Sequence, residues 1–165
     1  MPLAPSLPCP CGRPLTYERC CGRWHAGPDA LQAPTAEDLM RSRYSAFTLG
    51  LLDYLRDTWH PSTRPAAIEP LPAGLRWLGL DVRRHVQQDA DHAIVEFVAR
   101  SKLGGQAERL HETSRFVREG GRWFYVEGVH GAPPPGGGAS RRSLALPAPK
   151  GPSASGPAEP VPPLP

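Results

Sequence analysis

The chain has 165 residues, a net charge of +3 and 21% charged residues, which suits one ordinary domain with short additions. This weakly basic balance does not by itself indicate a nucleic-acid-binding protein. No apolar run approaches the ~20 residues that cross a bilayer, and the N-terminal segment lacks the basic and apolar regions of a secretory signal. We therefore expect no membrane association and a cytoplasmic location, where thiols stay reduced.

All four cysteines lie near the N-terminus, as Cys9 and Cys11 followed by Cys20 and Cys21. Adjacent cysteines do not easily form a disulfide with each other, because disulfide geometry needs separated Cα atoms. Four thiolates from two tight turns suit one tetrahedral Zn²⁺ ion, with His25 as an alternative to Cys21 for the fourth ligand. Four protein ligands leave no open coordination position, so we expect a structural rather than a catalytic ion.

Composition divides the chain into three parts. Residues 1–30 hold few large apolar side chains, so a bound zinc ion would serve as the local core of a knuckle, contributing on the order of 10 kcal/mol. Residues 31–131 are expected to form one α+β domain. Residues 132–165 contain half of the 22 prolines and no aromatic residue, so this Pro/Gly-rich tail is predicted to be disordered.

Two helices open the predicted α+β domain. Thr35 and Asp38 resemble a capping box at the start of the first helix, and Gly50 is expected to end it. The second helix is predicted over residues 51–59, where the His60-Pro61 pair stops it.

Strands follow the helices. Leu78, Leu80 and Val82 alternate with polar residues and glycine, which predicts that they share one face of the first strand. The pairs at 104–105 and 120–121 are both Gly-Gly, and each predicts a chain reversal. The four strands are predicted over residues 78–82, 93–102, 109–119 and 122–129. Helices followed by such an antiparallel meander predict helices packed on one face of a curved sheet.

The last hairpin allows a prediction of side-chain positions. A two-residue turn at 120–121 sets Phe116 opposite Tyr125 and Ser114 opposite Glu127. This face mixes aromatic rings with carboxylates, which suits either a polar pocket or a solvated surface. By alternation, its members are Glu112, Ser114, Phe116, Trp123, Tyr125 and Glu127.

Two sets of motifs resemble known families. CPCGRPLTYERCCG resembles the SEC-C metal-binding motif. TAEDLMRSRYSAFTLG, TWHPSTRP, VEFVAR and LHETSRFVREGGRWFYVEG together resemble the YchJ-like family of uncharacterised bacterial proteins, over residues 8–129. The resemblance implies a nuclear-transport-factor-2-like (cystatin-like) domain, a cone of helices on a bent antiparallel sheet with an internal cavity, and zinc on the four cysteines. Arg13 stands where the SEC-C motif often has serine, and we expect only a small effect on the turn.

Further polar and aromatic residues are candidates for a pocket inside the cone. Each also has a structural interpretation: a surface ion pair for Arg41, a contact with the last helix carbonyls for His60, and core packing for the aromatic rings. The full candidate set is Arg41, Tyr44, Trp59, His60, Glu112, Ser114, Trp123, Tyr125 and Glu127.

Three functions compete at this level. The favoured one is a non-catalytic binding protein whose knuckle docks a protein partner, while the cone is a scaffold or holds a small ligand; its contact residues would be Arg13, Arg19, Arg23 and Trp24. A second is a hydrolase or isomerase with acid and base groups in the cone, an analogy at the level of the fold. The third, nucleic-acid binding through the basic knuckle, is disfavoured by the modest net charge.

Overall fold

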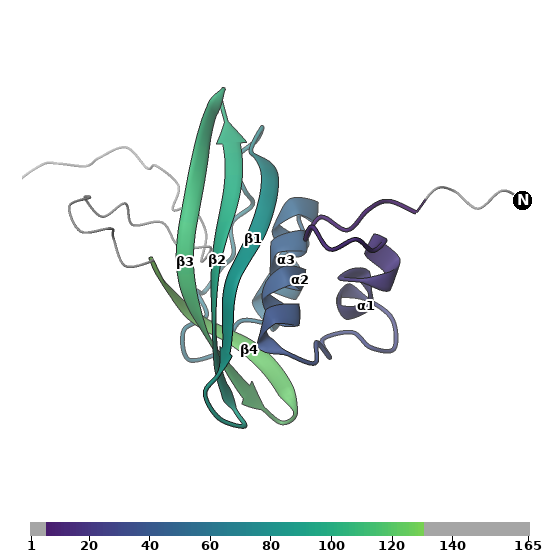
Figure 1. Cartoon of the computed structure of the whole chain (residues 1–165), viewed down its shortest axis with the longest axis vertical. Coiled ribbons are helices and arrows are strands. Elements are labelled where there is room, and N and C mark those ends of the chain that lie inside the picture. Colours follow the sequence, from purple (N-terminus) through teal and green to yellow (C-terminus); the bar gives the residue numbers. More distant parts are fainter. Residues whose placement is uncertain (1–5, 131–165) are drawn as a thin grey trace, which may run out of the picture.

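The computed structural model describes residues 6–130. Its four strands form one antiparallel sheet in the order β1-β2-β3-β4, and helices α2 and α3 cover one face of this sheet (Figure 1). The architecture is the predicted α+β type. The predicted disordered tail lies outside the described residues. The elements are η1 Tyr17–Arg19, α1 Gly22–His25, α2 Ala36–Leu49, α3 Leu52–Asp57, β1 Arg76–Gln87, β2 His92–Leu103, β3 Gln106–Glu119 and β4 Arg122–His130.

Helix α2 is the central element of the molecule. Its start is capped as predicted, because the Thr35 hydroxyl accepts a hydrogen bond of 3.0 Å from the backbone N–H of Asp38. Gly50 ends it in the left-handed conformation, with φ of 71°. The helix contacts β1, β2 and β4 on one side and α1 on the other, so it forms a middle layer between the sheet and the cysteine-bearing segment (Figure 1).

Helix α3 ends at Asp57, two residues before the predicted end. Beyond Asp57, the chain forms backbone hydrogen bonds with strand β4. The Tyr125 N–H donates to the Thr58 carbonyl at 2.9 Å, and the His60 N–H donates to the Tyr125 carbonyl at 2.7 Å. Trp59 thereby forms a parallel bridge with Tyr125. Edge pairing of this kind cannot be read from local helix signals.

The four predicted strands and the two Gly-Gly reversals are confirmed, although the strands are longer than predicted. The predicted alternation that puts Leu78 on one face with Leu80 is interrupted. A β-bulge between Trp77 and Gly79 inserts one extra residue in β1. Leu78 is therefore 56% exposed, while Trp77 and Leu80 pack against the core.

A second bulge changes the register between β3 and β4. Phe116 lies opposite Tyr125 as predicted, but the register shifts between Arg115 and Phe116. Ser114 consequently pairs with Gly128, so its predicted pairing with Glu127 is wrong. Glu127 instead lies opposite Arg115 and forms an ion pair with it at 2.6 Å. Glu127 is exposed and leaves the predicted pocket face.

The hydrophobic core fills the space between the sheet and the two helices. Among the described residues, no helix is both long and apolar enough to cross a bilayer. The most deeply buried members of the core include Leu39, Tyr44, Leu55, Val95 and Phe97.

Candidate metal centre and the interior of the cone

Four buried sulfur atoms form a compact cluster. The Sγ atoms of Cys9, Cys11, Cys20 and Cys21 all lie within 4.8 Å of one another, and their side chains are between 0% and 5% exposed. All four are free thiols. The Sγ atoms of Cys11 and Cys20 are 3.6 Å apart, close to the ~3.8 Å between two sulfurs that each lie about 2.3 Å from a tetrahedral zinc ion. The four cysteines could hold a metal ion.

Thiols of the cluster hold their protons unequally. Burial raises the pKa of Cys20 to about 12. The pKa of Cys21 is also raised, because its thiol hydrogen-bonds to Cys11 and Cys9. The pKa of Cys9 is lowered, because its sulfur accepts hydrogen bonds from Cys11 and Cys21. A divalent cation would replace the shared protons, so metal capture would release protons and weaken in acid.

His25 lies beside the cluster with both ring nitrogens engaged. Nε2 is 2.8 Å from the Ser42 carbonyl oxygen, and because a carbonyl only accepts, Nε2 must carry the proton. Nδ1 therefore accepts from the Tyr17 hydroxyl at 2.7 Å. The ring also packs edge-on to Tyr54, and burial lowers the pKa of His25. His25 therefore links Tyr17 of the knuckle to α2 through hydrogen bonds. It is not part of the sulfur cluster.

Helix α2 supports the cluster from behind. The Ser45 hydroxyl lies 3.8 Å from the Cys9 sulfur and is fully buried. The Arg41 guanidinium donates to the Cys11 carbonyl at 3.1 Å, so Arg41 lies beside the sulfur cluster and not in the cone where it was predicted. Arg13 binds Asp38 at 2.5 Å. The cysteine segment is thus locked onto the domain by contacts between residues far apart in sequence.

We expect Ser45→Ala to weaken metal retention by about 10- to 100-fold, because hydrogen bonds to ligand atoms typically contribute this much to metal affinity. Competition with a chelating dye measures the effect. Thr48→Ala is the matched control, since Thr48 is exposed on the same helix and should retain metal like the parent chain. Equal retention by both variants would contradict a role for Ser45.

Arg43 lies inside the cone and was missed as a site residue. Its guanidinium donates to the Leu55 carbonyl at 2.8 Å and to the Thr58 hydroxyl at 2.7 Å, and it lies 4.5 Å from the Tyr125 ring centroid. Burial lowers the pKa of Arg43 to about 10, so it remains charged at neutral pH. Its position in the sequence could have indicated this burial. Met40, Arg43 and Phe47 follow the i, i+3, i+7 spacing of residues on the buried face of a helix.

Three of the predicted pocket residues are joined by hydrogen bonds near Arg43. Glu112 is fully buried and accepts hydrogen bonds from the Ser114 hydroxyl at 2.7 Å and from the Tyr125 hydroxyl at 3.4 Å. The Glu112 carboxylate and the Tyr125 phenol both counteract the lowering of the Arg43 pKa. These groups form a buried polar network on one side of the apolar core.

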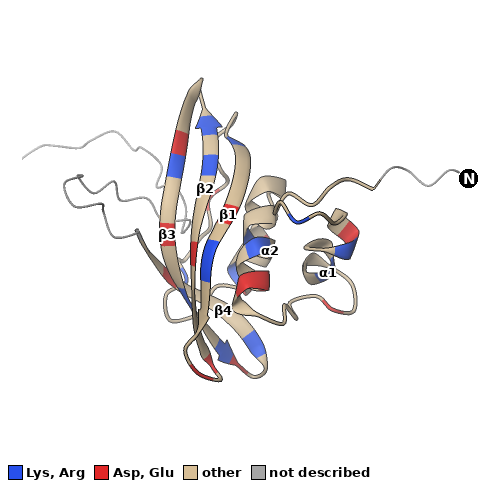
Figure 2. Ribbon diagram, in the orientation of Figure 1, with Lys and Arg blue, Asp and Glu red and all other residues tan. Residues whose placement is uncertain are grey.

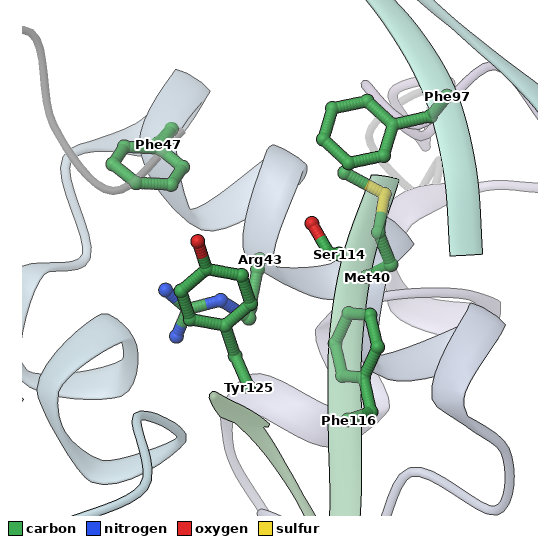
Figure 3. Close-up of a pocket in the computed structure, with 7 residues that line it drawn as sticks. All are labelled: Met40, Arg43, Phe47, Phe97, Ser114, Phe116 and Tyr125. Atoms are coloured by element: carbon green, nitrogen blue, oxygen red, sulfur yellow. The ribbon is translucent and has the colours of Figure 1, made fainter. Parts of the chain in front are cut away.

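The cavity beside this network is very small. Its volume is about 10 Å³, which is room for roughly one water molecule and far below the ~300 Å³ of a typical ligand pocket. The lining side chains close over it from the helix and the sheet (Figure 3). They are Met40, Arg43, Phe47, Phe97, Ser114, Phe116 and Tyr125.

The remaining candidates serve as structural contacts. Tyr44 packs edge-on to Trp77, Trp59 packs edge-on to Tyr125, and Trp123 donates its indole N–H to the Pro34 carbonyl. His60 lies away from the cone cavity. Its ring packs edge-on to Phe124, while Nε2 lies 3.0 Å from Glu119 and Nδ1 lies 2.6 Å from the Ser62 hydroxyl.

Gly128→Ala is expected to destabilise the protein by about 3 kcal/mol or more, because overpacking a filled core forces its neighbours to move. A Cβ atom at Gly128 would lie 1.7 Å from Oε1 of Glu112. Gly79→Ala is the control in β1, where the nearest atom, on Arg100, would be 4.0 Å away. Urea denaturation of both variants checks this; similar midpoints would show that Glu112 does not occupy the space over Gly128.

The fold and the cysteine cluster define a nuclear-transport-factor-2-like α+β domain with an N-terminal SEC-C motif. The family model for the middle NTF2-like domain of YchJ matches residues 35–128, and the SEC-C motif model matches residues 6–23. The chain belongs to this YchJ-like family, whose curated relatives carry the name UPF0225. The expected family resemblance is therefore confirmed.

Relatives and solved structures agree with this assignment. A UPF0225 protein of Methylibium petroleiphilum is 69% identical over 122 residues, covering 74% of this chain and 88% of the relative. One from Bordetella pertussis is 62% identical over 126 residues, covering 75% and 95%. The solution structure of a SEC-C motif containing protein from Rhodopseudomonas palustris is 34% identical with a TM-score of 0.66, covering 74% and 97%. A crystal structure of another from Psychrobacter arcticus is 32% identical with a TM-score of 0.60, covering 72% and 80%.

Proposed function

We propose that this chain is a zinc-dependent, non-catalytic binding protein whose knuckle docks a protein partner. The observation that carries this proposal is the set of four buried sulfur atoms within 4.8 Å of one another. Thiolates select zinc among the common divalent ions in a tetrahedral site. Since four protein ligands leave no position for water or substrate, the ion would stabilise structure and not act in catalysis.

The volumes of the cavity in the cone and of a hollow on the knuckle favour binding at the knuckle surface. The cavity in the cone measures about 10 Å³, so a small ligand or a substrate would not enter it as it stands. A hollow on the knuckle measures about 360 Å³, within the range of sites that accept a ligand or a partner side chain. This hollow is lined by Tyr17, Glu18, Gly22, Arg23, Ala26, Pro28 and Asp29.

Only two of the four contact residues that the sequence suggested remain available to a partner. Arg13 is engaged with Asp38, and Trp24 is buried in the core, so neither offers its side chain to a partner. Arg19 and Arg23 remain exposed. Arg23 lies 4.4 Å from the Trp24 ring centroid, which orients its guanidinium at the rim of the hollow. We assign partner contact to this part of the knuckle.

Metal counting with two ligand variants tests the zinc site. The parent chain should carry one zinc ion per molecule after purification in reducing buffer. Cys21→Ser should lose most of the metal, because it removes one of four ligands, whereas His25→Ala should keep it. The reverse order would place His25 in the coordination sphere and overturn the ligand set.

Site-specific cross-linking tests the docking surface. A photoreactive residue at Arg23 should capture a discrete protein in living bacteria, and a chelator or Cys21→Ser should abolish the capture. The same residue at Arg56, exposed on α3, is the control. Capture that is equal at both positions, or none at Arg23, would contradict docking through the knuckle.

A further inference from the structure

Four cations gather on the sheet face that points away from the helices. Arg76 lies directly opposite Lys102, and Arg100 lies directly opposite Arg109. Residues 100 and 102 are two apart on β2, so all four side chains share a face. This is the outer face, because the alternate residue Ala99 is buried in the core. All four cations are exposed. Basic bands lie near the upper ends of β1, β2 and β3, and one acidic band lies beside them on β3 (Figure 2).

These four cations lack acidic partners among the described residues. On the same strand β3, Arg115 pairs with Glu127 and Arg118 pairs with Asp91. Like charges directly opposite each other across two strands are destabilising. Two such pairs side by side therefore cost stability in the free protein, and an anionic partner would offset that cost.

An exposed leucine adjoins the cations. The bulge in β1 leaves Leu78 56% exposed, two residues after Arg76. Leucine side chains add nothing to phosphate binding but gain free energy when buried against another protein. The neighbouring aromatic residue, Trp77, packs inward against Tyr44 and offers no stacking platform for a nucleic-acid base.

The charge of the chain's own C-terminal segment does not complement the charge of the four cations. Residues 131–165 carry Arg141, Arg142 and Lys150 against the single acid Glu159. A segment with the same sign of charge as the patch would be repelled. The complementary group therefore comes from another molecule, and Arg side chains favour carboxylates because their planar forks bind them bidentately.

We propose that this basic and apolar patch docks an acidic, leucine-containing segment of a protein partner. The patch consists of Arg76, Leu78, Arg100, Lys102 and Arg109. It lies on the outer face of the sheet, while the knuckle lies beyond α2 on the other side (Figure 1). Binding here is independent of the metal ion, so it can hold or fail separately from the proposed docking through the knuckle.

The probe is a short labelled synthetic peptide of glutamate and leucine, titrated into the full chain at low salt and followed by fluorescence anisotropy. Arg100→Gln/Arg109→Gln should weaken binding by about tenfold or more, as expected when close charge pairs across an interface are lost. Arg115→Gln/Arg118→Gln removes the same charge from paired positions and should bind within about twofold of the parent chain. Because a repulsive pair is removed, the thermal midpoint of the first double variant should not fall below that of the parent.

Two further comparisons decide the nature of the partner. Leu78→Ser should weaken binding of the glutamate–leucine peptide but leave a polyglutamate peptide of equal charge unaffected. Oligothymidylate should bind more weakly than the glutamate–leucine peptide at the same salt concentration. Equal or tighter binding of the oligonucleotide would make the patch a phosphate-binding surface and overturn the proposal, as would no peptide binding at low salt or equal binding by the two double variants.

Discussion

Cys11→Ser is expected to abolish metal binding and to lower the free energy of unfolding by several kcal/mol. Cys11 is fully buried, and the buried cluster that it belongs to consists of the four cysteines, with Tyr17 packed against them. Zinc binding contributes on the order of 10 kcal/mol to the folding of zinc-finger peptides. Part of that contribution would be retained here, because contacts such as Arg13 with Asp38 also hold the segment on α2.

Guanidinium denaturation with metal analysis measures the effect. Chelator-treated parent chain should unfold at the same denaturant concentration as Cys11→Ser, since both lack the ion. Leu7→Ala is the control in the same segment, where the side chain is 72% exposed, and it should match the untreated parent. A Cys11→Ser variant that retains a full equivalent of zinc would refute the four-sulfur site.

Arg43→Met is expected to destabilise the protein by about 3–5 kcal/mol, the usual cost of removing one partner from a buried charge network. The variant would leave the fully buried Glu112 without the nearby guanidinium, and Leu55 and Thr58 without their donor. Thermal and urea denaturation give the free energy difference. Arg56→Met, which removes an exposed ion pair with Asp53, should leave the free energy of unfolding close to that of the parent chain.

The double variant Arg43→Met/Glu112→Gln separates charge from packing. If the two charges act on each other, the double variant should be less destabilised than the sum of the two single variants. Additive losses would mean that Arg43 acts only through its hydrogen bonds to the end of α3. Equal stability of Arg43→Met and Arg56→Met would contradict the whole account of the cone interior.

Local signals predicted the parts of the fold that depend on neighbouring residues. The caps at Thr35 and Gly50 and the Gly-Gly turn at 120–121 involve residues only a few positions apart, so their chemistry is visible in the sequence. The bulge at Leu78 and the register shift between β3 and β4 are different, because an extra residue in a strand is tolerated or excluded by packing against the whole sheet. The first turned Leu78 outward, and the second removed Glu127 from the expected pocket face.

In the candidate site, too, the features set by neighbouring residues were predictable, and those set by contacts between distant residues were not. The cysteines lie within a short segment, and their residue type and spacing were sufficient to predict that they come together in a group that could hold a metal ion. The support from α2 joins Cys9 to Ser45 and His25 to Ser42, contacts that exist only after the knuckle packs on the helix. The buried position of Arg43 was not predicted either. A charged residue is ordinarily assigned to the surface, even where it falls on the apolar face of a helix.

X-ray absorption spectroscopy at the zinc edge, on the purified 165-residue chain, tests most directly whether four cysteine sulfurs form a closed zinc site. The expected spectrum has a single shell of four sulfur atoms at about 2.3 Å. A mixed shell with a nitrogen or oxygen atom at about 2.0–2.1 Å would mean that His25 or water occupies one position, and that result would contradict the four-sulfur site.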